Sequence, residues 1–351
     1  MYNSFYKLAR SPFEVSPDPY FLYPTPKHHE ALAGLYYGIK ARKGFMVLTG
    51  EVGTGKTLVV RCLLDLLDKR RVGYAYVFNT LLSSREFLLY LADDLGISHQ
   101  SPSKSNLLIQ LNRHLISRYR QGLITLLVVD EAQHLSVEVL EEIRLLTNLE
   151  TPHGKLLQIM LVGQPELDAK LESHELRQLK QRVALRFRLQ PLSLDETRAY
   201  VKRRLKLAGG NPEIFAPPAL DDVFRYSRGI PRLINTLCDN ALISAFSLGS
   251  AQVLPDLVDE VALDLQLPRD GHPGGNHRAP AGSNQELAPA DEAGRAVDSG
   301  AGSPGADGAS GSDLTAEQPA VPSAGAAAAI EPGRNGQAKV GEIAAHEEAN
   351  E

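Results

Sequence analysis

The stretch LTGEVGTGKTLVV (48–60) decides what this sequence folds into. It fills the pattern G-x-x-x-x-G-K-[ST], with Lys56 and Thr57 at its end. The apolar run before it (44–50) predicts a strand and the run after it predicts a helix, which is the context that such a loop requires. Glycines let backbone amides turn toward phosphate oxygens, and the start of a helix adds its positive end. The stretch therefore predicts a loop that binds a nucleotide.

Each part of this loop has an expected role. Lys56 is expected to reach the outer phosphates, and the Thr57 hydroxyl to ligate magnesium. A glycine-rich turn without a ligand is the alternative. The predicted cofactor-binding residues of the loop are Gly50, Glu51, Val52, Gly53, Thr54, Gly55, Lys56, Thr57 and Leu58.

Short apolar runs alternate with amphipathic segments around this loop. The apolar runs suit parallel strands that are buried on both faces, and the segments between them repeat apolar residues at three and four, as helices do. The alternation predicts a parallel sheet covered by helices on both sides, and the helical patterns that follow Pro191 predict a small helical domain. The expected strands are 44–50, 72–79, 123–130, 156–163 and 183–191, and the expected later helices are 195–209, 218–229, 231–246 and 254–267.

The composition changes sharply near residue 267. From there to the end the sequence has no Phe, Tyr or Trp and holds 5 Lys and Arg against 13 Asp and Glu, which predicts a disordered acidic tail. The residues before it hold 32 Lys and Arg against 29 Asp and Glu, so net charge names no partner. The expected organisation is an N-terminal segment (1–43), a P-loop domain (44–192), a helical lid domain (193–266) and the tail (267–351).

Cysteine usage and hydropathy bear on the compartment. Cys62 and Cys238 lie in apolar helical runs, so a disulfide framework is not expected and a reducing compartment is. The N-terminus has no apolar signal segment, and the longest apolar runs, such as 123–129, are far shorter than a membrane span. We therefore expect a cytoplasmic protein without direct membrane insertion.

A second informative stretch is LLVVDEAQHL (126–135), where an apolar run ends in two carboxylates. Asp130 is expected to hold magnesium through its coordinated water, and Glu131 to polarise the attacking water as general base. Capping of the next helix is the alternative for this acidic pair. His134 is interpreted as a structural residue.

Two weaker features follow further along the chain. LVGQPEL (161–167) places Gln164 just beyond a strand end, where its amide could hold the lytic water against the terminal phosphate, although Gln-Pro is also an ordinary turn. SRGIPRLIN (227–235) places Arg232 at the expected start of a helix. There Arg232 could reach the nucleotide, so that the charge of the nucleotide would affect the angle between the two domains. Solvation of Arg232 at the surface is the alternative.

Taken in order, these motifs resemble the AAA+ ATPases, and most closely the ExeA-like group associated with general secretion pathway protein A. The resemblance runs from Met1 to about residue 265 and includes GFMVLTGEVGTGKT, VVDEAQHL, LVGQPEL, LKQRV and GIPRLIN. It implies an α/β P-loop core with a five-stranded parallel sheet and a helical lid, with ATP and Mg²⁺ as cofactors. It also implies Gln164 as sensor 1 and Arg232 as sensor 2.

The resemblance further implies a homo-oligomer in which one subunit donates an arginine to its neighbour's ATP. That arginine is expected in ELRQLKQRVALRFRLQPLS (175–193), with Arg182 as first choice and Arg177 as second. An arginine supplied in trans neutralises charge that develops on the transferred phosphoryl group. Arg186 and Arg188 are expected to face solvent or a partner.

The aromatic N-terminal segment also has an expected role. Phe13, Tyr20, Phe21 and Tyr23 are expected to pack against the sheet domain, and walling of the adenine is the alternative.

The expected function is ATP hydrolysis that drives conformational change in an oligomer. Family members in secretion systems carry a membrane helix and a peptidoglycan-binding domain after the ATPase; neither follows here. The expectation is therefore a motor that serves a secretion, exosortase or polysaccharide-export system, with an envelope protein as partner. A metabolite kinase would leave DEAQ and GIPR without a role.

The alternative is a DNA-binding AAA+ ATPase of the transposition or origin-recognition-like type. Basic clusters could follow a phosphate backbone if assembly aligned them, whereas solvated helix ends explain each cluster separately. Nucleic acid is therefore the less favoured partner. The clusters are Lys40, Arg42 and Lys43; Lys69, Arg70 and Arg71; and Lys202, Arg203, Arg204 and Lys206.

Overall fold

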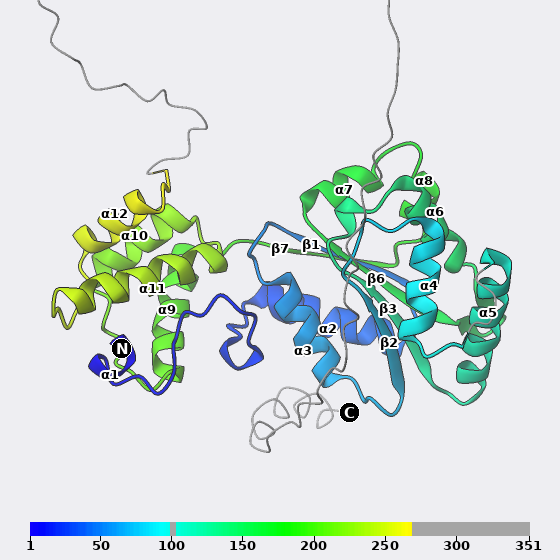
Figure 1. Cartoon of the computed structure of the whole chain (residues 1–351), viewed down its shortest axis with the longest axis horizontal. Helices are drawn as coiled ribbons and strands as arrows, with labels where there is room; N and C mark the ends of the chain where they lie inside the picture. Colours follow the sequence, from blue (N-terminus) through cyan, green and yellow to red (C-terminus); the bar gives the residue numbers. More distant parts are fainter. Residues whose placement is uncertain (99–102, 269–351) are drawn as a thin grey trace, which may run out of the picture. The chain divides into compact units, whose positions relative to one another are not determined.

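Five parallel strands form a sheet in the order β2-β3-β6-β1-β7 (Figure 1). The computed structural model describes residues 1–98 and 103–268, so nearly all of the predicted acidic tail lies outside the described residues. All five strands fall within predicted apolar runs, and the prediction of a five-stranded parallel sheet is confirmed. The strands are β1 (Phe45–Gly50), β2 (Val72–Val77), β3 (Ile124–Val129), β6 (Leu157–Gly163) and β7 (Leu185–Leu189).

Burial differs between the middle and the edges of the sheet. Every residue of β1, β3 and β6 is buried, as expected for strands with neighbours on both sides and helices on both faces. The prediction of burial on both faces is wrong for β2 and β7. These are the two edge strands, each with a neighbouring strand on one side only. Tyr74 on β2 is 40% exposed, and Arg186 on β7 is exposed.

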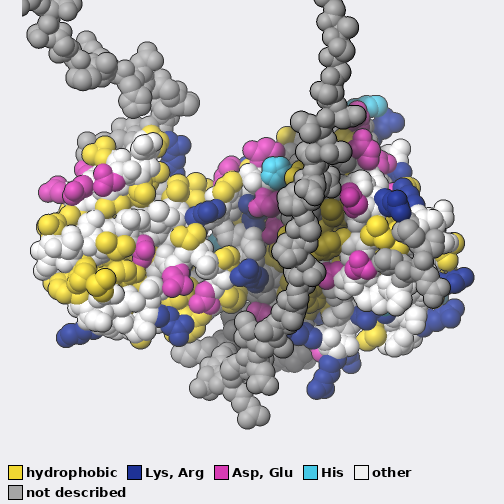
Figure 2. Space-filling view, in the orientation of Figure 1, with side chains coloured by type: hydrophobic (Ala, Val, Ile, Leu, Met, Phe, Trp, Pro, Cys, Tyr) yellow, Lys and Arg dark blue, Asp and Glu magenta, His cyan; other side chains and the backbone are white. Residues whose placement is uncertain are grey.

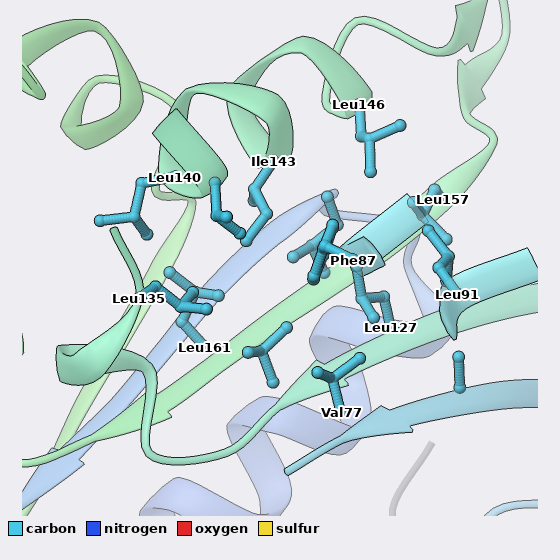
Figure 3. Close-up of a cluster of buried hydrophobic side chains, with 14 of the residues drawn as sticks. Val77, Phe87, Leu91, Leu127, Leu135, Leu140, Ile143, Leu146, Leu157 and Leu161 are labelled. Carbon is cyan, nitrogen blue, oxygen red and sulfur yellow. The ribbon is translucent and has the colours of Figure 1, made fainter. Parts of the chain in front are cut away.

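Helices cover both faces of the sheet (Figure 1). Side chains of α2 (Pro26–Lys40) and α3 (Lys56–Leu66) pack with Leu126 and Val128 of β3. Side chains of α4 (Ser84–Asp94), α5 (Lys104–Arg120) and α6 (Val137–Leu146) pack with Leu127 and Val129. Figure 3 shows part of this cluster, with Phe87 of α4, Ile143 of α6 and Leu127 of β3. Successive strand residues point to opposite faces, so one apolar strand supplies two cores. The remaining elements here are η2 (Ala132–His134), β4 (Glu150–Thr151), β5 (Gly154–Lys155), α7 (Pro165–Leu171) and α8 (Arg177–Lys180).

A separate helical cluster follows β7. Its members are α9 (Leu194–Leu207), α10 (Pro217–Ser227), α11 (Pro231–Ser247) and α12 (Pro255–Asp264), which match the four predicted helices. Ser193 and Glu196 form a capping box at the start of α9, and proline lies in the first turn of the other three helices. Their apolar faces form one core.

The part of the N-terminal segment that precedes α2 packs into this helical core, whereas α2 covers the sheet. It contains α1 (Tyr2–Phe5) and η1 (Pro19–Phe21). Phe13 is fully buried and meets Phe215 edge to face at 6.1 Å. The expectation that the aromatic residues pack against the sheet domain is therefore wrong for Phe13, Phe21 and Tyr23, which pack in or against the helical core. It is also wrong for Tyr20, whose hydroxyl donates to the Leu207 carbonyl of α9. Aromatic residues in a sequence predict buried side chains, but they do not identify the surface against which those side chains pack.

Arg204 explains part of this packing. Its guanidinium donates to the Pro12 carbonyl at 2.5 Å and lies 4.6 Å from the Phe21 ring centre. Arg204 is 5% exposed, and Lys202 pairs with Glu213 at 2.7 Å. The interpretation of this cluster as a set of solvated cations is therefore wrong for Arg204.

A glycine at the junction between sheet and helices provides a test of the fold. Gly229 has φ 73°, and a Cβ there would lie 1.9 Å from the Leu192 carbonyl oxygen. Gly249 has φ 66°, but a Cβ there would meet no atom of the described residues within 4 Å. Both alanine variants lose about 1–2 kcal/mol of unfolding free energy from the left-handed backbone. Gly229→Ala should lose about 1–3 kcal/mol more from overpacking. Urea unfolding measures both, and equal losses would contradict the close packing at Gly229.

Candidate nucleotide-binding site

The predicted loop lies between β1, which ends at Gly50, and α3, which begins at Lys56. Gly53 and Gly55 have φ of 80° and 98°, a backbone region that favours glycine. Lys56 is 6% exposed, and its ammonium donates to the carbonyls of Gly50 at 2.8 Å and Glu51 at 3.0 Å. Burial lowers the pKa of Lys56, while the nearby charges of Glu131 and Asp130 oppose that shift. The loop thus holds a buried cation beside carboxylates.

The structure brings the two predicted magnesium ligands together. Thr57 donates its hydroxyl hydrogen to Asp130 Oδ2 at 3.2 Å. A hydroxyl that donates in this way keeps its oxygen lone pairs for a cation, and Mg²⁺ prefers oxygen ligands. Thr57 and Asp130 therefore fit a magnesium ion in chemistry and placement.

Glu131 and Gln164 also lie together. The Gln164 side-chain amide donates to Glu131 Oε2 at 3.2 Å, and the Gln133 amide donates to the same oxygen at 2.6 Å. Burial opposes ionisation of Glu131, but these hydrogen bonds and the charge of Lys56 hold its pKa below the usual value. Glu131 is also left-handed, with φ 51°, an uncommon backbone state for a non-glycine residue. An ionised, restrained carboxylate thus follows Asp130.

Gln133, which no sequence motif indicated as a site residue, connects Glu131 and Gln164. Besides donating to Glu131, it accepts the Gln164 backbone N–H on its Oε1 at 3.1 Å. Gln133 is 9% exposed. Its place two residues after Glu131 was visible in the sequence, but the contact with Gln164 depends on how β3 and β6 align.

Arg232 reaches the P-loop through its backbone. Its N–H donates to the Gly53 carbonyl at 3.2 Å, and a Cβ on Gly53 would lie 2.6 Å from the Arg232 Cβ. The start of α11 therefore lies directly against the P-loop, and the Arg232 side chain is exposed. The prediction that this arginine meets a nucleotide stays a prediction.

Arg182 lies apart from the P-loop contacts. It is exposed just after α8, and its charge contributes, after Lys155, to lowering the pKa of Glu150. Arg177 contacts the His174 ring at 3.1 Å. Arg186 is exposed as expected and forms ion pairs with carboxylates on α7 and just after it. The assignment of Arg182 or Arg177 to a neighbour's nucleotide stays a prediction.

Two further residues contact the site and were missed from sequence. The His28 ring lies 3.4 Å from the Thr54 carbonyl and 2.7 Å from the Thr25 hydroxyl, and burial lowers its pKa. The Tyr76 hydroxyl donates to Asp130 at 2.7 Å. Both contacts join segments far apart in sequence, so no local pattern indicated them.

Comparisons with known proteins agree with this geometry. Residues 39–171 match the family model described as an AAA domain. The fold is similar to that of Cdc6p from Pyrobaculum aerophilum, with TM-score 0.56 and 21% identity over 72% of this chain and 70% of that one. It is also similar to ORC2 from Aeropyrum pernix in ADPNP-ADP complexes, with TM-score 0.52 and 18% identity over 71% and 72% of the chains. Residues 39–171 thus contain an AAA domain, and the fold is that of the AAA-type P-loop proteins.

A curated relative defines the group more narrowly. General secretion pathway protein A of Aeromonas hydrophila is 46% identical over 271 residues, which make up 77% of this chain and 49% of that protein. The resemblance to the ExeA-like group is thereby confirmed, and the chain spans about half the length of this relative. Among the described residues, the helices are too short or too polar to cross a bilayer.

The amide network around Glu131 gives a prediction about proton affinity. Gln133→Met removes the shorter of two hydrogen bonds to the carboxylate, so the pKa of Glu131 should rise toward its ordinary value. Carboxyl ¹³C chemical shifts in glutamate-labelled protein measure that pKa, with Glu131→Gln to assign the signal. Gln121→Met, which alters an exposed amide bonded to Ser117, should leave it unchanged. An unaltered or lower pKa in Gln133→Met would contradict the network.

Proposed function

We propose that this protein binds ATP with Mg²⁺ at the P-loop and hydrolyses the ATP. The observation that carries the proposal is the convergence of two predicted pairs at the carboxyl edge of the sheet. Thr57 contacts Asp130, and Gln164 contacts Glu131. The structure of ORC2 from Aeropyrum pernix in ADPNP-ADP complexes supports a nucleotide of this class.

The described side chains divide the work of such a reaction. Lys56 neutralises phosphate charge, and Thr57 and Asp130 would hold magnesium, which supplies further charge neutralisation when bound. Glu131 accepts the proton of the attacking water, and the Gln164 amide orients that water. Both amides donate to Oε2 of Glu131, and an ionised carboxylate has about four acceptor sites, so Oε1 can accept a hydrogen bond from the attacking water. The lowered pKa of Glu131 keeps this carboxylate ionised.

The same contacts suggest how hydrolysis becomes motion. The start of α11 lies on the P-loop through Arg232 and Gly53, and Leu192 donates its N–H to the Gly229 carbonyl at 2.8 Å just before that helix. A shift of the P-loop would therefore displace the start of α11 and, with it, the helical domain. We propose the division into segment 1–43, P-loop domain 44–192 and lid 193–266 as the moving parts.

The setting of this activity is also a proposal. The name of the curated relative, general secretion pathway protein A, supports a role in a secretion system. We propose an exosortase or polysaccharide-export system as the alternative setting. We propose a cytoplasmic homo-oligomer with an envelope protein as partner, in which Arg182, or Arg177, reaches the neighbour's ATP. An arginine in trans makes turnover depend on assembly.

Replacement of the P-loop lysine tests nucleotide binding. Lys56→Ala should abolish ATP binding and turnover, because it removes the buried cation that the loop holds beside Glu131 and Asp130. Lys69→Ala, which alters an exposed lysine beyond the other end of α3, is the matched control and should behave like the wild type. A fluorescent ATP analogue and released phosphate measure the two properties. Full binding by Lys56→Ala would contradict the site.

Mixing experiments test the arginine in trans. Arg182→Ala alone should hydrolyse ATP poorly, and so should Lys56→Ala alone. A mixture should recover turnover, because a Lys56→Ala subunit can still donate Arg182 to a neighbour with an intact P-loop. Arg188→Ala, on an exposed position of β7, is the control. Mixtures that stay inactive while Arg182→Ala remains oligomeric would reject Arg182 and move the test to Arg177.

DNA action remains a second candidate because two of the three basic clusters share one end of the sheet. Lys40 and Lys43 precede β1, and Lys69 to Arg71 precede β2; all five are exposed. Lys and Arg side chains are visible along the lower and right-hand edges of the sheet domain in Figure 2. Duplex DNA that stimulates turnover, with a steep loss at higher salt, would favour this candidate. No binding at low salt would remove it.

A further inference from the structure

Three donors converge on the Asp130 carboxylate. Its Oδ1 accepts the Glu131 backbone N–H at 3.0 Å. Its Oδ2 accepts the Thr57 hydroxyl at 3.2 Å and the Tyr76 hydroxyl at 2.7 Å. Asp130 is 6% exposed, so a carboxylate that lost one of these donors would be poorly compensated by water. Tyr76 makes the shortest of these three contacts.

The backbone of Tyr76 is itself fixed. Tyr76 lies on the edge strand β2, and two side chains of α4 satisfy the backbone groups that face away from β3. Its N–H donates to Asp94 Oδ2 at 2.6 Å, and its carbonyl accepts the Tyr90 hydroxyl at 3.4 Å. On the other side, the neighbouring residue Val77 pairs with Val129 in the sheet. Tyr76 is thus held by both a helix and a strand.

The Tyr76 ring also lines a cavity that ends at the predicted magnesium ligands. The cavity has a volume of about 450 Å³. A phenol hydroxyl is protonated at neutral pH, so the Tyr76 hydroxyl can donate its hydrogen to Asp130. The cavity is lined by Thr57, Arg61, Leu64, Tyr74, Tyr76, Phe78 and Asp130.

We infer that Tyr76 is a positioning residue that orients Asp130 for magnesium. The inference rests on the proposed function, since it concerns the same nucleotide site. Carboxylates that hold metals are themselves oriented by hydrogen bonds, and loss of such a contact weakens metal binding. A packing role alone would need only the Tyr76 ring, whereas the positioning role needs its hydroxyl. Tyr76→Phe separates the two roles because it keeps the ring.

The test measures metal dependence apart from turnover. A fluorescent ADP analogue is bound to the full chain in excess EDTA, and then across a magnesium titration. Tyr76→Phe should need about ten times more magnesium for the half-maximal change. Its affinity in EDTA should stay within twofold of wild type. Tyr74→Phe, on the same strand and cavity wall, should match the wild type in both conditions.

A second variant keeps the test decisive if Tyr76→Phe unfolds. Tyr90→Phe removes a contact to the Tyr76 backbone and should move the magnesium midpoint in the same direction by a smaller factor. Thermal unfolding checks that each variant folds.

The outcomes separate the inference from the proposed function. An unchanged or lower magnesium midpoint in Tyr76→Phe would overturn the inference, and so would equal weakening in EDTA and in magnesium. Wild-type protein that bound no nucleotide, or bound it without regard to magnesium, would instead overturn the proposed function.

Discussion

The hydrogen bonds around the Asp130 carboxylate are the interactions on which the site depends. They join the helix after β1, the edge strand β2 and the turn after β3, through Thr57, Tyr76 and Glu131. A carboxylate with so little exposure needs such donors, because an unpaired buried charge costs several kcal/mol. One buried group thus sets the relative positions of three chain segments. The P-loop and the turn that carries Glu131 both contact this carboxylate.

In the turn after β3, the backbone of Glu131 is strained and its side chain is restrained by hydrogen bonds. Glu131 adopts a left-handed backbone, and its carboxylate accepts two amides. Uncommon backbone states of this kind cost about 1–3 kcal/mol and persist only where the surroundings fix them. In this turn, Gln133 provides that fixation by contacting both Glu131 and the start of α7. The proposed base is therefore placed and restrained by the same side chain.

Local sequence patterns predicted most of the helices and strands and the central residues of the candidate site. The P-loop was predictable because its chemistry lies within eight consecutive residues, and the pair Asp130–Glu131 because it ends a strand. The five strands and the four later helices followed from periodicity. Edge position was not predictable from these patterns, and burial on both faces was wrongly expected for β2 and β7. The order of strands is a long-range property that apolar runs do not encode.

The residues that sequence missed are those whose role depends on long-range alignment. Tyr76 meets Asp130 only because β2 and β3 pair in one register. His28 meets the P-loop only because α2 packs beside α3. The aromatic residues of the N-terminus were predicted to pack against the sheet domain. That prediction was wrong, because this segment packs against Arg204 and the helical core. Such contacts require the fold before they can be recognised.

The assignment of Glu131 as the base of an ATP hydrolase is the central claim. A single-turnover experiment with radiolabelled ATP tests it most directly, with wild-type protein and Glu131→Gln compared at equal occupancy. The account predicts that Glu131→Gln binds ATP and retains it unhydrolysed while the wild type forms ADP. Hydrolysis by Glu131→Gln at the wild-type rate would contradict it.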